Sequence, residues 1–168
     1  MLYRGKGHIF GDNINTDYII SSRRKRDTLN ELELSKYLME DIDPKFAARI
    51  SPGDFIVAGN NFGCGSAMEI AALVVRGAGI PVILAKSFSR TFYRNGINTG
   101  ILLVVCDTSK IKPDDMIEVN ATDASTQVIV NNSIYAQTLP LPETIRTIIR
   151  CGGLVAYMCK YGDFTGVF

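Results

Sequence analysis

The chain has 168 residues, of which 46% are hydrophobic and 21% are charged, and its formal net charge at pH 7 is +1. This size and composition are typical of a globular protein with one core, so we expect a single domain over residues 1–168. The nearly balanced charge provides no field that would attract nucleic acid or a membrane surface, and no segment has the pattern of a membrane span or a signal peptide. We therefore expect a cytoplasmic protein that binds neither nucleic acid nor a membrane.

The first part of the chain alternates between short apolar runs and longer periodic segments. We expect strands at residues 6–10, 55–58, 82–85 and 101–105 and helices at residues 29–40, 66–78 and 87–95, so that strand and helix alternate along the chain. Clusters of turn residues separate several of these segments. The alternation predicts parallel strands with helices packed against them, and hence an α/β fold class.

The remaining part has a different pattern. Short apolar runs predict strands joined in hairpins at 116–119, 127–130 and 133–135, with Asn131-Asn132 as one of the turns. Two helices are expected next, one that follows Pro142 and stops before Gly152-Gly153, and one at 154–160. Together the segments predict a compact α/β sandwich or barrel-like arrangement.

A glycine-rich turn at 60–66 joins the 55–58 strand to the following helix. Such a turn lets the backbone approach a ligand closely, and amides at a helix start favour an anion. Ser66 adds a hydroxyl there, so one interpretation is a site for a small acidic substrate. The other is structural, because Ser66-x-x-Glu69 has the form of a capping box. A dinucleotide-binding turn is a poor third interpretation, because Met68 stands where its third glycine belongs.

Residues that commonly bind metals are few and scattered. The only histidine is His8, and the four cysteines, none spaced as C-x-x-C, are Cys64, Cys106, Cys151 and Cys159. We therefore expect no metal site made by this chain alone and free, mostly buried thiols. Cys64 lies in the glycine-rich turn, where a helix N-terminus would make a thiol reactive, but we favour a packing role. His8 is expected on the surface of the first strand.

Three motifs occur in a fixed order, namely Gly11-Asp12-x-Ile14-Asn15-Thr16-Asp17, Ala58-Gly59-Asn60-Asn61-Phe62-Gly63-Cys64-Gly65-Ser66 and Ala85-Lys86-Ser87-Phe88-Ser89-Arg90-Thr91-Phe92-Tyr93-Arg94-Asn95. On these motifs the chain resembles the small subunits of 3-isopropylmalate dehydratase, in the aconitase family. The resemblance extends from the first strand to the Gly-Gly before the last helix. It implies the three-layer β/β/α swivelling domain of that family.

The resemblance also implies a function. Proteins of this kind are one half of a two-subunit hydro-lyase, which isomerises a 2-hydroxy acid by dehydration and rehydration in leucine biosynthesis. In the family the large subunit carries a 4Fe-4S cluster, so the expected partners are that subunit and a small di- or tricarboxylic acid, and this chain binds no cofactor itself. A homo-oligomer of the isolated chain is left open.

Site residues follow from the same resemblance. The serine at the position of Ser66 acts as the base that takes the carbon-bound proton, and the aspartate at the position of Asp17 belongs to the active-site network. Gly65 and Ala67 stand at substrate-binding positions. Considered without the family, Asp17 would be interpreted as a turn or cap residue.

The chain departs from the family pattern next to Ser66. Where the family usually has Gly-Ser-Ser-Arg-Glu-His, this chain has Gly65-Ser66-Ala67-Met68-Glu69-Ile70. The second serine and the arginine, which hold a substrate carboxylate in the family, are therefore Ala67 and Met68 here. Losing a bidentate arginine contact costs roughly 1.5–3 kcal/mol of binding.

A loop at 21–28 offers replacement cations. Arg23 aligns with the family's loop arginine, and Arg24 and Arg26 are candidate substitutes for the missing one. A solvated charge run without a function is the alternative. The substrate therefore stays open: a homoaconitate- or dimethylmalate-type acid is one alternative, and a non-enzymatic binding module that uses residues 23–26 is another. The near-neutral charge and the lack of a stacking aromatic motif argue against nucleic acid.

Overall fold

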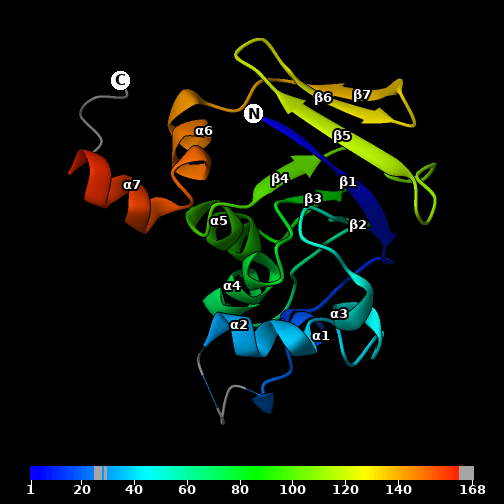
Figure 1. Cartoon of the computed structure of the whole chain (residues 1–168), viewed down its shortest axis with the longest axis vertical. Coiled ribbons are helices and arrows are strands. Elements are labelled where there is room, and N and C mark those ends of the chain that lie inside the picture. Colours follow the sequence, from blue (N-terminus) through cyan, green and yellow to red (C-terminus); the bar gives the residue numbers. More distant parts are fainter. Residues whose placement is uncertain (25–27, 29, 163–168) are drawn as a thin grey trace.

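The computed structural model describes residues 1–24, 28 and 30–162, and its strands form one seven-stranded sheet in the order β4-β3-β2-β1-β5-β6-β7 (Figure 1). The strands are β1 (Leu2–Ile9), β2 (Phe55–Ala58), β3 (Val82–Ala85), β4 (Leu102–Val105), β5 (Met116–Ala121), β6 (Thr126–Val130) and β7 (Ser133–Thr138). β1 pairs in parallel with β2 through residues 7–9 and antiparallel with β5 through residues 2–6. One long strand therefore belongs to a parallel half and to an antiparallel half.

Short helices lie between β1 and β5 in the chain and after β7. They are α1 (Thr16–Ile19), α2 (Glu31–Leu34), the 3-10 helix η2 (Ser35–Tyr37), α3 (Phe46–Arg49), α4 (Glu69–Gly77), α5 (Arg90–Asn98), α6 (Glu143–Arg150) and α7 (Leu154–Tyr161). Figure 1 shows α1 to α5 on the side of the parallel strands that faces away from β5, β6 and β7, whereas α7 projects from the body. Within the described residues, no helix combines the length and the apolar character needed to cross a membrane.

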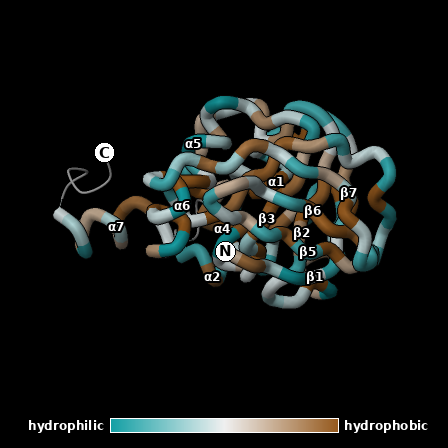
Figure 2. The backbone as a smooth tube through the Cα atoms, turned by 90° about the horizontal axis from the view of Figure 1, so that it is seen from above, coloured by the Kyte–Doolittle hydropathy of each residue, from teal (hydrophilic) through white to brown (hydrophobic). Residues whose placement is uncertain are grey.

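The parallel strands are buried on both faces. Alternate side chains point to opposite sides, so Ile56 and Ile83 pack with the helices, whereas Val57 and Leu84 pack with β5 residues such as Ile117. Figure 2 shows the hydrophobic segments gathered in the strands, inside largely hydrophilic loops. Strands buried on both faces form continuous apolar runs, which is why the bounds of β2 and β3 are those predicted. The three layers are the helices, the parallel half of the sheet, and the antiparallel half that packs on it. The predicted α/β class and β/β/α layers are therefore confirmed.

The helix predicted at 29–40 was wrong in its length, because the chain forms two short pieces, α2 and η2. Asn30 caps α2 by accepting hydrogen bonds from the amides of Leu32 and Glu33 at 2.9 and 3.4 Å. The 3-10 helix ends at Tyr37, because Leu38 has a non-helical ψ of 123° and Met39 has a positive φ of 60°. Both side chains are fully buried, so packing against the core ends the helix earlier than its local propensity would.

Other predicted boundaries shift by a few residues. The first strand begins at Leu2 rather than at residue 6, and the helix predicted at 87–95 runs as α5 from Arg90 to Asn98. The predicted hairpin turn at Asn131-Asn132 is confirmed, with φ values of +49° and +66°. Positive φ at both positions is the geometry of a tight hairpin turn, which asparagine tolerates well.

The expectation that His8 lies on the strand surface was wrong. His8 is 9% exposed, and its ring meets that of Phe46 edge to face at a centroid distance of 5.3 Å. Its Nε2 lies 2.9 Å from Oδ2 of Asp54, which also accepts a hydrogen bond from the Ser51 amide, while Oδ1 of Asp54 accepts one from the Lys6 amide. A buried polar ring needs such a partner, and the carboxylate that supplies it stands far away in the sequence.

Candidate functional site

Three loops meet at the carboxyl edge of the parallel strands. They follow β1, β2 and β3, and they contain the three sequence motifs at 11–17, 58–66 and 85–95. In open sheets with parallel strands, ligands bind beyond the carboxyl ends of the strands. The fold therefore brings the three motifs together at the edge where a ligand site is expected.

The loop after β1 is joined to the glycine-rich turn by a short ladder of hydrogen bonds. The Gly63 amide donates to the Ile14 carbonyl at 2.7 Å, and the Thr16 amide donates to the Cys64 carbonyl at 2.8 Å. The Thr16 hydroxyl then donates to the Ser66 carbonyl at 3.0 Å. Because Asp17 is the next residue after Thr16, this ladder fixes Ser66 relative to the helix that carries Asp17.

Gly65 is required by this geometry. Its φ is +92°, and a Cβ atom at this position would overlap the side-chain amide of Asn15. That amide has its own role, because its oxygen accepts the Asp17 amide at 2.9 Å and caps α1. Asn15 and Thr16 thus hold the loops that carry Ser66 and Asp17 together, although of these three motif residues the sequence analysis named only Asp17 as a candidate site residue. An asparagine two residues before an acidic residue is an N-cap signal that could have identified Asn15.

The loop after β3 supports the turn from its other side. The Ser89 hydroxyl donates to the Gly63 carbonyl at 2.6 Å, and the Ser89 amide donates to the Phe62 carbonyl at 2.9 Å. The Ser89 oxygen also accepts the Phe92 amide at 3.2 Å, which caps α5. The Phe62 and Phe92 rings pack edge to face beneath the turn, with centroids 5.1 Å apart. The turn therefore rests on a buried aromatic pair.

The capping-box interpretation of Ser66 was wrong. The helix α4 begins at Glu69, three residues later than predicted, and its N-cap is Met68, which makes no side-chain cap hydrogen bond. Ser66 is exposed, and no hydrogen bond to its Oγ is formed within the described residues. The Asp17 carboxylate is half-buried and likewise has no ion pair or hydrogen bond within the part of the chain that the structure describes. Both groups are free to meet a ligand.

Comparison with known families decides the identity of this arrangement. A family model described as the aconitase C-terminal domain matches residues 12–109, which span all three loops. The chain belongs to the aconitase C-terminal domain family.

Individual relatives of the aconitase family agree over nearly the whole chain. The 3-isopropylmalate dehydratase small subunit 2 of Archaeoglobus fulgidus is 44% identical over 161 residues, which are 95% of this chain and 96% of the relative. The methanogen homoaconitase small subunit of Methanocaldococcus jannaschii is 38% identical over 95% of this chain and 93% of its own. The crystal structure of a 3-isopropylmalate dehydratase from Methanocaldococcus jannaschii superposes with a TM-score of 0.88 at 37% identity, covering 96% of each chain.

The residues that depart from the aconitase-family pattern lie beside Ser66. Ala67 is exposed, whereas Met68 is half-buried against the helical side of the core. Ile70 packs against the same core. Hydrophobic contacts therefore occupy positions where the resemblance expects polar groups, and Met68 has no cationic head to present to a substrate.

The loop arginines have partners of their own. Two nitrogens of Arg24 donate to the two carboxylate oxygens of Glu40 at 2.8 and 2.7 Å, and its guanidinium stacks 3.8 Å from the centre of the Tyr37 ring. These hydrogen bonds, together with the charge of Arg24, lower the pKa of Glu40. Arg23 is 73% exposed and pairs with Asp41 at 3.0 Å. Arg26 lies outside the described residues.

No group of three or more potential metal ligands occurs within residues 1–24, 28 and 30–162. All four cysteines are free, but the expectation that they are mostly buried was wrong, since Cys64, Cys106 and Cys151 are only partly buried and Cys159 is exposed. Burial raises the pKa of the Cys106 thiol to about 11, and the charge of Asp107 adds to the effect. Cys106 therefore stays protonated at neutral pH.

Proposed function

We propose that this chain is the small subunit of a two-subunit hydro-lyase, 3-isopropylmalate dehydratase, and that it is active only together with its large subunit. The observation that carries the proposal is that the Ser66 side chain is exposed at the carboxyl edge of the sheet. The turn that contains Ser66 is hydrogen-bonded to α1, the helix that carries Asp17. The 44% identical Archaeoglobus fulgidus small subunit supports this assignment.

In the proposed reaction, the deprotonated Ser66 oxygen takes a proton from the substrate carbon, and the hydroxyl group of the neighbouring carbon leaves as water after it takes up a proton from solvent. Rehydration of the resulting alkene with the opposite orientation gives the isomer. A serine hydroxyl is a weak base, so it needs nearby groups that stabilise its deprotonated form. The proposed sources are backbone amides of the Gly65–Ala67 segment, and Asp17 completes the polar network.

The large subunit is proposed to carry the 4Fe-4S cluster, as membership of the aconitase family implies, and the described residues of this chain hold no group of three or more potential metal ligands. When bound there, the cluster supplies a Lewis acid for the substrate hydroxyl and carboxylate. The part proposed for this chain is to provide the base and the contacts on the opposite side of the substrate.

A substrate carboxylate still needs a cation, since Met68 cannot supply one. Arg23, Arg24 and Arg26 are the proposed sources, because their loop connects α1, which carries Asp17, with α2. Arg24 is already arranged as a bidentate carboxylate binder, with the carboxylate of Glu40 in that role. A substrate carboxylate would compete with Glu40 for the same guanidinium.

A second candidate is a homoaconitase-type subunit, which would act on a longer tricarboxylic acid. It is favoured by the change at Met68 and by the 38% identical homoaconitase relative. The test is to reconstitute the chain with its large subunit and to measure kcat/KM for 3-isopropylmalate, homoaconitate and dimethylmalate. The proposal expects the highest value for 3-isopropylmalate, whereas a preference for homoaconitate would support the second candidate. A complex that turns over none of these acids would leave a binding module as the better interpretation.

A further inference from the structure

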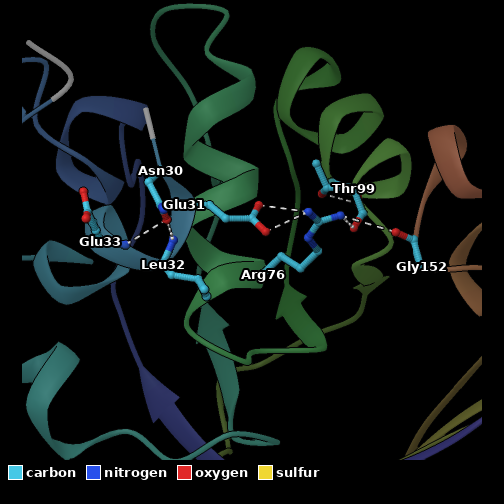
Figure 3. A network of polar contacts seen from close by, with 8 residues as sticks. Asn30, Glu31, Leu32, Glu33, Arg76, Thr99 and Gly152 are labelled. Carbon is cyan, nitrogen blue, oxygen red and sulfur yellow. Dashed lines mark hydrogen bonds and ion pairs between the residues drawn. The ribbon is translucent and has the colours of Figure 1, made fainter. Parts of the chain in front are cut away.

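Arg76, in the last turn of α4, joins four separate parts of the fold (Figure 3). Its Nη2 donates to the two carboxylate oxygens of Glu31 at 3.0 and 2.9 Å. Its Nη1 donates to the carbonyls of Thr99 and Gly152, each at 3.3 Å. One guanidinium thus meets four acceptors, which come from three different segments.

The acceptors explain why a cation is stable at this position. Thr99 is the C-cap of α5, and Gly152 directly follows the C-cap of α6, so both carbonyls lie at helix ends where backbone acceptors lack helical partners. The C-terminal ends of helices also carry partial negative charge. These carbonyls orient one side of the guanidinium and leave its other side for Glu31.

Glu31 is the first residue of α2, and α2 lies directly against the end of α4. A Cβ atom on Gly77 would stand 2.8 Å from the Glu31 carbonyl oxygen, so only glycine permits this approach. Asn30 caps the same helix start through the amides of Leu32 and Glu33 (Figure 3). Arg76 and Gly77 therefore fix the point where the chain leaves the arginine loop and enters α2.

The segment that begins at Glu31 then holds a loop arginine. α2 continues into η2, whose Tyr37 ring stacks under the Arg24 guanidinium, and Glu40 binds that guanidinium through both of its oxygens. A shift at the start of α2 would move Tyr37 and Glu40, and Arg24 would move with them.

We infer that Arg76 is a positioning residue for the substrate, acting through α2 and η2 on Arg24. The inference rests on the proposed function, in which Arg24 binds a substrate carboxylate. It assigns a role in substrate affinity to a side chain that lies at the far end of α4 from Ser66.

The test is a double-mutant cycle in the reconstituted two-subunit enzyme. Arg76→Ala is expected to raise KM about five-fold with kcat changed less than about two-fold, as for a residue that affects binding alone. In the Arg24→Ala background the same change is expected to have no further effect on KM, because residues that act through one group are not additive. Additive effects on KM, or an unchanged KM in the Arg76→Ala enzyme, would overturn the inference.

Arg150→Ala is the matched control, since Arg150 also lies in the last turn of a helix but is bonded only to Thr147 within the described residues. It is expected to leave KM unchanged. If Arg76→Ala does not fold, Glu31→Gln is the second variant, because it keeps the side-chain shape and removes the charge. It is expected to raise KM about three-fold, and to have no effect on KM in the Arg24→Ala background.

A readout that does not need turnover separates this inference from the proposed function. Arg76→Ala is expected to accelerate amide hydrogen exchange over residues 31–38 about ten-fold in the isolated chain, whereas Arg150→Ala leaves it unchanged. Unchanged exchange after Arg76→Ala would overturn the inference even if the enzyme is active. Accelerated exchange in a chain whose complex turns over no hydroxy acid would instead count against the proposed function.

Discussion

Replacing Thr16 by valine removes one hydrogen bond that holds the candidate base in place. Thr16 is 2% exposed, and its hydroxyl donates to the Ser66 carbonyl at 3.0 Å. Valine keeps the shape of the side chain, and the Thr16 amide still reaches the Cys64 carbonyl at 2.8 Å, so the variant should fold. Losing one neutral hydrogen bond costs about 0.5–1.5 kcal/mol of unfolding free energy.

The effect on catalysis should be larger than the effect on stability. A misplacement of about 1 Å in a catalytic group can cost on the order of 100-fold in rate, so we expect a kcat loss of about 10-fold from partial loosening of Ser66, with KM nearly unchanged. The assay is steady-state turnover of the reconstituted enzyme beside urea denaturation of the isolated chain.

Thr108→Val provides the control for this prediction. The Thr108 hydroxyl also donates to a backbone carbonyl fifty positions away, that of Ala58 at 2.7 Å, but it does not touch the Ser66 turn. Both variants should lose similar stability, and only Thr16→Val should lose kcat. Equal kcat values in the two variants would refute the reasoning that this bond positions Ser66.

Two further predictions concern charged groups. Arg24→Ala should raise KM for the acidic substrate about ten-fold, whereas Lys36→Ala, on the adjoining 3-10 helix, should change KM less than about two-fold. Equal effects of the two variants in steady-state kinetics would show that the loop arginines are solvated charges without a role in substrate binding. Burial alone would raise the pKa of Asp54, but hydrogen bonds from His8 and from two backbone amides outweigh it and lower that pKa. Because the folded-state pKa lies below the unfolded one, Asp54 stabilises the fold above about pH 4, and this contribution is lost as the pH falls through the lowered value. Asp54→Asn should therefore lower the free energy of unfolding, measured by urea denaturation, by about 1–3 kcal/mol at pH 7 and by less at pH 3. An equal loss at both pH values would contradict this account.

The sequence predicted best where local pattern and tertiary burial agree. β2 and β3 are continuous apolar runs buried on both faces, and their bounds are those predicted. The helix at 29–40 failed because Leu38 and Met39 turn into the core, which local periodicity does not reveal. His8 failed for the same reason, since its partner Asp54 reaches it only through the pairing of β1 with β2.

The site was predictable in its motifs and not in its contacts. Ser66 and Asp17 were identified by resemblance, and whether they act in catalysis stays a prediction. The bonds that join their loops, from Thr16 and Ser89, depend on strand order and could not be inferred from either motif alone. The capping-box pattern at Ser66 misled because Met68 is extended and α4 begins only at Glu69. The ion pair of Arg24 with Glu40 spans sixteen positions and has no local signal.

The most direct test of the account is the turnover number of the reconstituted enzyme with Ser66→Ala, measured beside Ser133→Ala on the exposed strand β7. Loss of a general base typically costs 100- to 10,000-fold, so we predict a kcat decrease of roughly 1,000-fold for Ser66→Ala, with KM changed less than about three-fold. The same variant should no longer exchange the carbon-bound hydrogen of the substrate with deuterium from solvent. Full activity and full exchange in Ser66→Ala would show that the hydroxyl is not the base.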